Sequence, residues 1–373
     1  MVGRISYLDW NATAPLRPEA ATAMAAAMAR VGNPSSVHFY GRAAKATMED
    51  AREAVASLLG ADPAAMIFTS GGTEANHLAL RGFPDRRLIV SAIEHDSVLA
   101  AASPDATILP VDGNGVADLD ALERMLRADP RPALVSLMLA NNETGVIQPV
   151  RDAARLVHAN GALLHCDAVQ GIGRISFSIS KLEADLVTLS AHKIGGPAGV
   201  GALIASPDLP LRPLITGGGQ ERRRRAGTEN LLGIVGFGAA AAATAHGMAA
   251  EATRIAALRE TAERRLLSLA PDAQIHGMAA SRLPNTISIA MPGVPAATQL
   301  MALDLAGVMV SAGSACSSGK VTRSHVLDAM GVVPALADSA IRISLGHDTT
   351  EAEIDQLVAA WGALHRRTRA RAA

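Results

Sequence analysis

The alternation of strand-like and helix-like patterns between residues 66 and 205 constrains the fold more than any other feature of this sequence. Short apolar runs rich in Val, Ile and Leu are separated by segments with helical spacing or with turn residues. This order is typical of a parallel sheet whose strands are connected by crossover helices. The pattern predicts strands at residues 66–69, 88–92, 107–111, 134–139, 163–166, 186–190 and 200–205, with helices between them near 74–80, 97–102, 119–127 and 150–160.

The flanking regions follow other patterns. Helical spacing predicts helices at residues 18–30 and 42–59 before the sheet and one helix at 231–268 after it. Farther along, residues 285–290, 308–311 and 340–345 look like strands of a smaller α+β unit, which a strand at residues 5–8 could join. Because 373 residues is long for one hydrophobic core, we expect two domains. The α/β domain would span residues 14–255, and the small domain would combine residues 1–13 and 256–373.

Composition excludes several classes of protein. A net charge of -1 argues against nucleic acid or an acidic membrane as the main partner. Two cysteines and no Cys/His cluster with zinc spacing predict a reducing compartment and no metal site. The amino terminus has no pattern of an export or import signal, so we expect a cytoplasmic protein. Residues 231–250 are uncharged but rich in Ala and Gly, and we interpret them as a buried helix rather than a membrane span.

Residues suited to one cofactor follow four of the predicted strands. A Gly-rich loop at residues 69–76 opens a helix like a phosphate cradle that lacks the Walker lysine. His95 follows another strand and could stack on a planar ring or transfer protons. Asp167 ends an apolar run and needs a cationic partner, and Lys193 stands where a strand turns into a Gly-Gly-Pro loop. Their joint occurrence predicts pyridoxal 5′-phosphate, which an Asp tunes at the ring nitrogen and a Lys amine binds.

Each of these signals has an ordinary structural alternative when it is taken alone. Lys193 is one of only four lysines in the chain, yet a lysine at a strand end can simply point to water. Cys316 lies among small Ser, Ala and Gly residues, which favours an exposed, mobile loop where a thiolate can act as a nucleophile. The alternative for a free cysteine is burial as a small hydrophobe, and that alternative fits Cys166, inside an apolar strand, much better.

Taken together, these residues resemble the pyridoxal-phosphate-dependent cysteine desulfurases of the NifS/IscS type, within class V of the fold-type I aminotransferase superfamily. The resemblance implies a fold-type I transferase with a large, mostly parallel seven-stranded sheet domain and a smaller α+β domain. The similar motifs follow in order over nearly the whole chain, at residues 7–9, 32–38, 69–74, 94–95, 141–143, 167–170, 190–193, 217–221, 225–228, 283–286, 314–316 and 341–346.

The family implies roles at matching positions. Lys193 would bind the cofactor covalently and shuttle the substrate Cα proton. Asp167 would pair with the ring nitrogen, Gln170 would bond the phenolic oxygen, and His95 would stack on the ring and transfer protons. The phosphate would be bound by Gly72, Thr73, Ser190 and His192, joined by Thr228 from the other subunit of a homodimer.

The resemblance also implies a substrate and a reaction. Asn142 and Arg342 would hold the carboxylate of L-cysteine, for which a planar arginine is well suited. Cys316 would attack the sulfur of the cysteine–cofactor adduct and become a persulfide, with release of L-alanine. An acceptor protein for iron–sulfur cluster assembly, or for thiolation of tRNA or cofactors, would then take the sulfur. The cysteine loop resembles that of the subgroup with a long, mobile loop.

Two features depart from the family pattern, and other functions remain open. The arginines at residues 222–225 exceed the usual basic positions there, and we interpret them as a solvated or phosphate-proximal basic edge rather than a nucleic-acid site. The short segment after Gly346 leaves the identity of the acceptor open. Alternative functions are a selenocysteine lyase, another class V aminotransferase, or a scaffold without turnover. The joint presence of five functional residue types argues against the scaffold, namely Lys193, Asp167, His95, Arg342 and Cys316.

Overall fold

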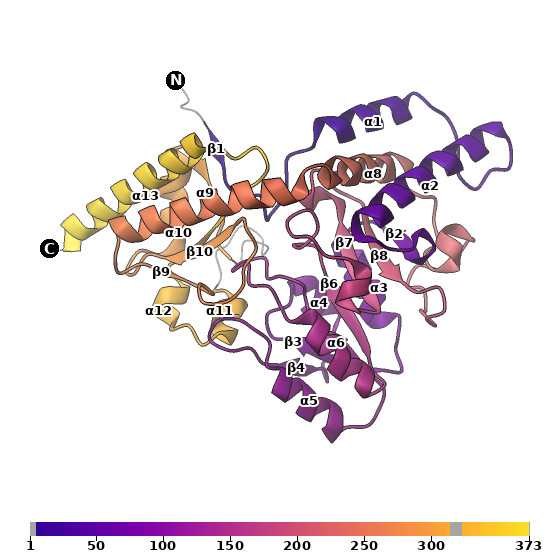
Figure 1. Cartoon of the computed structure of the whole chain (residues 1–373), viewed down its shortest axis with the longest axis horizontal. Coiled ribbons are helices and arrows are strands. Elements are labelled where there is room, and N and C mark those ends of the chain that lie inside the picture. Colours follow the sequence, from indigo (N-terminus) through magenta and orange to yellow (C-terminus); the bar gives the residue numbers. More distant parts are fainter. Residues whose placement is uncertain (1–4, 314–322, 373) are drawn as a thin grey trace.

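A seven-stranded sheet forms the centre of the larger lobe in the computed structural model, which describes residues 5–313 and 323–372 (Figure 1). The strands are β2 (Met66–Thr69), β3 (Arg87–Ser91), β4 (Thr107–Leu109), β5 (Ala133–Ser136), β6 (Leu163–Asp167), β7 (Leu186–Ser190) and β8 (Gly201–Ala205). Their order is β2-β8-β7-β6-β5-β3-β4, and only β8 runs antiparallel to its neighbours within this sheet. The predicted mostly parallel α/β sheet is therefore confirmed.

Helices cover both faces of this sheet, which explains why its strands are apolar throughout rather than alternating. Leu134 and Val135, adjacent on β5, belong to two separate hydrophobic clusters, one on each face. One face packs against α3 (Gly72–Arg81) and α4 (Asp96–Ala101). The opposite cluster includes residues of α1 (Pro18–Met28), α2 (Phe39–Leu59), α5 (Leu119–Ala128), α6 (Val150–Ala159), α7 (Ile179–Leu182) and α8 (Leu231–Ala245).

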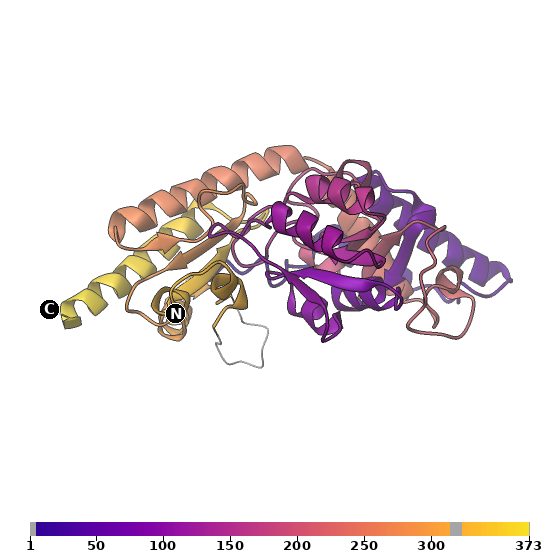
Figure 2. The same cartoon turned by 90° about the horizontal axis from the view of Figure 1, so that it is seen from below.

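The smaller lobe has its own core, built on two short sheets. Strands β9 (Gln274–Ile275), β10 (Thr286–Ala290) and β12 (Ala340–Ser344) are antiparallel in the order β12-β10-β9. As expected, the amino-terminal strand β1 (Ser6–Tyr7) joins this lobe, where it pairs with β11 (Val308–Met309). The helices are α9 (Met248–Leu269), α10 (Ala296–Leu305), α11 (His325–Ala329), α12 (Pro334–Ala337) and α13 (Glu351–Ala372), whose end marks the outer end of the lobe (Figure 2). The predicted domain boundary at residue 255 stays a prediction, because α9 runs across it.

The prediction of one helix over residues 231–268 is wrong, because the chain bends by 76° between α8 and α9. The bend follows His246 at Gly247, whose φ of +79° suits a residue without a side chain. Within the described ranges, no single helix is long and apolar enough to span a membrane, and this bent pair reaches that length and composition only across its break. Phe237 and Ala240 of α8 are buried, as expected for a core helix.

The arginine run at residues 222–225 is built into the fold. Arg224 donates to the carbonyl oxygens of Ala205, Ser206 and Leu209, and Arg225 forms an ion pair with Glu74 at 2.9 Å. Arg222 and Arg223 are exposed, as a solvated edge predicts. Arg224 and Arg225 depart from a solvated edge, because internal acceptors hold their half-buried guanidinium groups, and the acceptor of Arg225 belongs to the Gly-rich loop.

Glu221, which precedes this run, anchors it. Its two carboxylate oxygens accept hydrogen bonds from Arg52 at 2.8 and 3.0 Å, and one also accepts from the backbone N–H of Phe68 at 2.8 Å. Both side chains of this ion pair are nearly fully buried. The backbone adopts positive φ at Glu221, Arg222 and Arg223, with values of 44°, 54° and 65°. Left-handed conformations cost energy in non-glycine residues, and this buried ion pair stabilises the turn against that cost.

Candidate active site

A cavity of about 250 Å³ lies where β6 and β7 end and α3 begins. Parallel strands bring their carboxyl ends to one edge, which explains why residues distant in sequence meet here. A larger cavity of about 480 Å³ also touches Lys193 but is lined by no other predicted cofactor residue. The smaller cavity is lined by the predicted residues Gly72, Thr73, His95, Asn142, Asp167, Gln170, Ser190, His192 and Lys193, and also by Ala12, Asn76, Ser97, Met138, Ala140 and Val169.

Lys193 ends the short 3-10 turn Ala191–Lys193 that directly follows β7. Its Nζ donates hydrogen bonds to the backbone oxygens of Asn11 at 2.5 Å and Ala12 at 2.9 Å. Those carbonyls belong to the segment that crosses from the small lobe into the large one. The lysine that the sequence singles out therefore faces the cavity and is oriented by backbone from the amino-terminal segment.

Asp167 is a buried carboxylate at the end of β6. Its Oδ2 accepts a hydrogen bond from Asn76 Nδ2 at 2.8 Å, and its Oδ1 accepts from the backbone N–H of Val169 at 3.0 Å. Within residues 5–313 and 323–372, Asp167 forms no ion pair. A buried carboxylate of this kind is stabilised by a cationic ligand, and a protonated pyridine nitrogen is one.

The two residues that follow β3 differ in charge. Glu94 is fully buried, and burial, followed by repulsion from Asp167, raises the pKa of its carboxyl well above the ordinary value. A neutral Glu94 adds no negative charge beside Asp167. His95 Nδ1 accepts the backbone N–H of Ser97 at 3.1 Å and caps α4. This contact assigns the proton of the neutral His95 ring to Nε2.

The start of α3 forms the phosphate end of the cavity. Gly71, the residue that precedes the helix, supplies no side-chain cap, which leaves the first backbone N–H groups available to an anion. A Cβ added to Gly72 would lie 3.1 Å from Val169 Cγ2, so a side chain there would crowd the cavity wall. Burial, then the charges of Lys193 and Arg174, lower the pKa of His192 to about 4. His192 is therefore a neutral hydrogen-bonding group near neutral pH.

These residues fit pyridoxal 5′-phosphate. The buried Asp167 is matched by a ring cation, the uncapped helix start is matched by a phosphate, and the Lys193 amine stands at the same cavity. Gln170 also lines the cavity, and its amide is already oriented, because Nε2 donates to the Asn11 oxygen at 3.1 Å while Oε1 accepts from Arg174. The individual roles of these side chains stay predictions.

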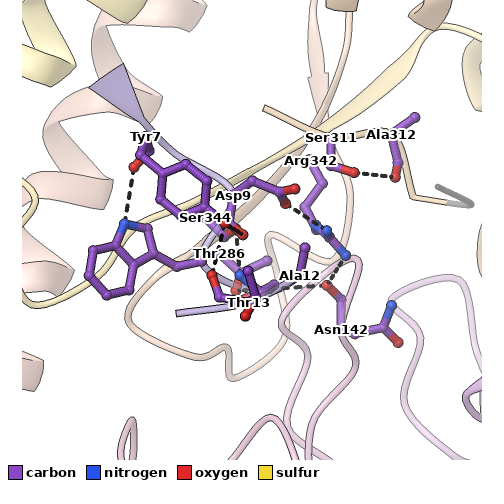
Figure 3. Close-up of polar contacts among 12 residues, drawn as sticks. Tyr7, Asp9, Ala12, Thr13, Asn142, Thr286, Ser311, Ala312, Arg342 and Ser344 are labelled. Atoms are coloured by element: carbon purple, nitrogen blue, oxygen red, sulfur yellow. Dashed lines mark hydrogen bonds and ion pairs between the residues drawn. The ribbon is translucent and has the colours of Figure 1, made fainter. Parts of the chain in front are cut away.

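The predicted substrate residues are only partly brought together. Asn142 lines the cavity, whereas the side chain of Arg342, from β12, does not. Arg342 instead lies between Asp9 and the backbone of Asn142 (Figure 3). Its Nη2 donates to Asp9 Oδ1 at 2.8 Å, and its Nη1 donates to the Asn142 oxygen at 3.2 Å.

Two predicted residues are not at the cavity. Thr228 is exposed and lines a separate hollow of about 110 Å³ beside Ser70 and Arg225, so within its own chain it does not reach the cofactor residues. Its predicted role in the partner subunit stays a prediction. Cys316 lies outside the described residues. The other cysteine, Cys166, is fully buried, and burial raises the pKa of its thiol well above the ordinary value.

Sequence reasoning missed several residues of the site. Asn76, which binds Asp167, stands four positions after Gly72 and therefore on the same face of α3, so helical spacing could have identified it. Arg174 follows Gln170 by the same interval and donates to its side-chain and backbone oxygens. Asn11 and Ala12 act on Lys193 through backbone oxygens, for which the sequence carries no signal.

Comparison with known proteins places the chain in a family. Residues 6–357 match the family Aminotransferase class-V. A cysteine desulfurase of Cereibacter sphaeroides is 46% identical over 366 residues, covering 94% of this chain and 93% of that protein. An X-ray structure of a NifS-like protein from Rickettsia africae has a TM-score of 0.92 at 37% identity, covering 97% of this chain and 100% of that one. A structure of SspA in complex with cysteine has a TM-score of 0.78 at 28% identity, covering 91% of this chain and 98% of that one. The chain therefore belongs to the class-V aminotransferase family and, within it, to the cysteine desulfurases of the NifS/IscS type.

Proposed function

We propose that this protein is a cysteine desulfurase that uses pyridoxal 5′-phosphate to remove sulfur from L-cysteine. The observation that carries the proposal is the cavity that joins Lys193, Asp167 and His95 to an uncapped helix start. The similarity to the cysteine desulfurase of Cereibacter sphaeroides and to the cysteine complex of SspA supports the choice of substrate. When bound, the cofactor supplies an electron sink for negative charge at the substrate Cα.

The residues of this chain would divide the remaining work. Lys193 Nζ would take the Cα proton and return it, since the amine faces the cavity from the end of β7. Asp167 would keep the ring nitrogen protonated, and the neutral Glu94 beside it adds no second negative charge. His95, with its proton on Nε2, would donate a hydrogen bond at the ring or the substrate. Arg342 and Asn142 would bind the carboxylate.

Cys316 would receive the sulfur. The Cβ–S bond of the substrate breaks, an S–S bond forms on the thiolate of Cys316, and the electron pair of the broken bond stays with Cβ, which takes up a proton to give L-alanine. The enzyme persulfide then passes its outer sulfur to an acceptor thiol. We propose a protein acceptor that serves iron–sulfur cluster assembly or thiolation of tRNA or cofactors.

A homodimer in the cytoplasm is part of the proposal. Val37, Phe39 and Tyr40 are exposed at 88%, 69% and 55% around the start of α2, an apolar group that a second copy would cover. Thr228 is exposed at a hollow beside the Gly-rich loop, where it is open to a partner. The low cysteine content suits a reducing compartment.

The test is the release of sulfide and L-alanine from L-cysteine in the presence of a reductant. Wild-type enzyme should release the two products in equal amounts, and Cys316→Ala should release neither. Cys166→Ala is the matched control and should keep activity, because the Cys166 thiol is buried and protonated. Sulfide that persists in Cys316→Ala would indicate a lyase of the selenocysteine lyase type. A keto acid in place of alanine would indicate an aminotransferase.

A further inference from the structure

The ion pair between Arg342 and Asp9 stands beside the proposed active site and has no role yet. Arg342 is 6% exposed and Asp9 is 22% exposed, so the pair is largely removed from water. It joins the strand β12 to the segment that follows β1, residues 333 positions apart in sequence (Figure 3). A buried arginine that loses its carboxylate partner carries an uncompensated charge, so Asp9 determines where this guanidinium is stable.

The backbone fixes the position of Asp9. Asp9 forms a parallel bridge with Ser344, two residues after Arg342 on the same strand. The hydroxyl of Tyr7 donates to the Asp9 backbone oxygen at 3.2 Å, and Leu8 donates its N–H to Met309 at 2.8 Å. Since residues two apart on a strand share a face, this register sets the Asp9 carboxylate against the Arg342 side chain.

Two nitrogens of the Arg342 guanidinium have hydrogen-bond acceptors, and the third has none in the described part of the chain. Nη2 is held by Asp9 and Nη1 by the backbone oxygen of Asn142, whereas Nε is buried without an acceptor in the described part of the chain. A buried N–H without an acceptor is costly, and a carboxylate oxygen is an acceptor that would remove this cost. Asn142 lines the cofactor cavity, so the guanidinium that binds its backbone oxygen is anchored next to that cavity.

A second buried cation, Arg174, makes a negatively charged partner for Arg342 more important. Burial and then the charge of Arg342 lower the pKa of Arg174 to about 9. Arg174 donates to the backbone oxygens of Gln170 and Trp10 and to the side-chain amide oxygen of Gln170. Two guanidinium groups in one buried region repel each other, and the Asp9 carboxylate offsets that repulsion on the side of Arg342.

We propose that Asp9 is a positioning residue that orients Arg342 for the α-carboxylate of the amino-acid substrate. The inference rests on the proposed function, since it assigns Asp9 to the same substrate. Without Asp9, the guanidinium has no fixed orientation. Substrate binding then carries the additional entropy cost of ordering this side chain. The loss therefore falls on the affinity for ligands that carry a carboxylate, and not on the chemical step at Cβ.

The experiment compares two aminothiols that differ in the carboxylate, L-cysteine and cysteamine. Both are titrated into cofactor-loaded wild type, Asp9→Asn and Arg342→Ala while the visible absorption of the cofactor is followed. Asp9→Asn should weaken L-cysteine binding roughly 10-fold or more and leave cysteamine within about 2-fold. In turnover, KM for L-cysteine should rise while kcat stays within about 2-fold. Asp9→Asn added to Arg342→Ala should cause no further loss, because Asp9 acts through Arg342.

Asp304→Asn is the matched control, because Asp304 lies on the neighbouring helix α10 and forms no ion pair within the described residues. Equal weakening of both aminothiols, no change in either, or tighter binding of L-cysteine would each overturn the proposal. If Asp9→Asn does not fold, Asp9→Glu takes its place, with an expected partial loss confined to L-cysteine. Failure of the proposed function itself is recognised separately, since wild type would then release no alanine.

Discussion

Two buried carboxylates beside the large sheet, Glu221 near the edge strand β2 and Asp167 at the end of the central strand β6, have very different surroundings. Glu221 is a closed carboxylate, which means that its charge is paired within the fold. Arg52 donates to both of its oxygens and the Phe68 N–H donates to one of them. Asp167 is an open carboxylate, which means that its charge has no partner of opposite sign within the described residues. It accepts hydrogen bonds from Asn76 and Val169 but forms no ion pair in the described part of the chain. A closed pair contributes to the fold alone, whereas an open carboxylate beside a cavity gains an ion-pair partner when a cationic ligand binds.

A third buried carboxyl, Glu94, takes another course. Within the described residues it has no cationic partner and no position on the cavity wall, and its raised pKa favours the protonated form. Ion pairing, ligand binding and protonation are thus three ways for one protein to keep a carboxyl group in its interior. The difference between them teaches that the site is found where charge is present but not compensated.

The largest expected effect is that of replacing Lys193, which lines the same cavity as Asp167. Lys193→Ala should reduce alanine formation by roughly 10³- to 10⁴-fold, because the amine is proposed to carry the Cα proton. The readouts are alanine release and the visible absorption of the bound cofactor. Lys181→Ala, an exposed lysine on α7, is the control and should behave as wild type. Substantial turnover by Lys193→Ala would refute the assignment.

Breaking the ion pair between Arg52 and Glu221 should lower the stability of the fold and leave catalysis nearly unchanged. Arg52→Met leaves Glu221 buried without its cation, which should lower the free energy of unfolding by about 3–5 kcal/mol. Denaturant unfolding measures this change, and alanine formation per folded enzyme should stay within about 3-fold of wild type. Arg151→Met removes an exposed pair with Glu183 and should cost less than about 1 kcal/mol. Equal costs for the two variants would contradict the distinction between closed and exposed pairs.

Neutralising Asp167 should instead lower catalysis and leave the stability of the fold unchanged. Asp167→Asn should reduce alanine formation by roughly 10²- to 10³-fold, because charge stabilisation at the ring nitrogen is lost. Its thermal unfolding midpoint without cofactor should not fall. Asn76 Oδ1 has no partner within the described residues, so a flipped Asn76 amide can accept from the new amide. A large loss of stability in the cofactor-free variant would show that Asp167 is a structural residue.

The smallest expected effect is the pH dependence contributed by Glu94. Because the folded-state pKa is raised above its ordinary value of 4.5, this carboxyl contributes stability below that value and loses it as pH rises. Glu94→Gln stays neutral, so its thermal midpoint relative to wild type should increase between about pH 5 and pH 8. Glu53→Gln, at an exposed position on α2, should show no such trend. A constant difference across the pH range would disprove a protonated Glu94.

The sequence alone determined the sheet and most of the cofactor cavity. Apolar runs followed by polar residues locate strand ends, and parallel strands must bring those ends to one edge. Gly72, His95, Asp167 and Lys193 could therefore be predicted to meet before any coordinates were known, and they do. Such residues are predictable because local pattern and sheet register are sufficient to place them.

Only the tertiary structure decided how charges are paired across the chain. Arg342 meets Asp9, and Arg52 meets Glu221, over separations of 333 and 169 residues, which no local pattern reports. The arginines after Glu221 read as a surface edge in sequence, yet internal carbonyl oxygens bind Arg224. Gly247 likewise separates α8 from α9, where Ala-rich spacing alone would continue one helix. Local propensity fixes which elements form, but partner choice depends on which elements pack together, because a buried charge takes its partner from whatever the fold brings within hydrogen-bonding distance.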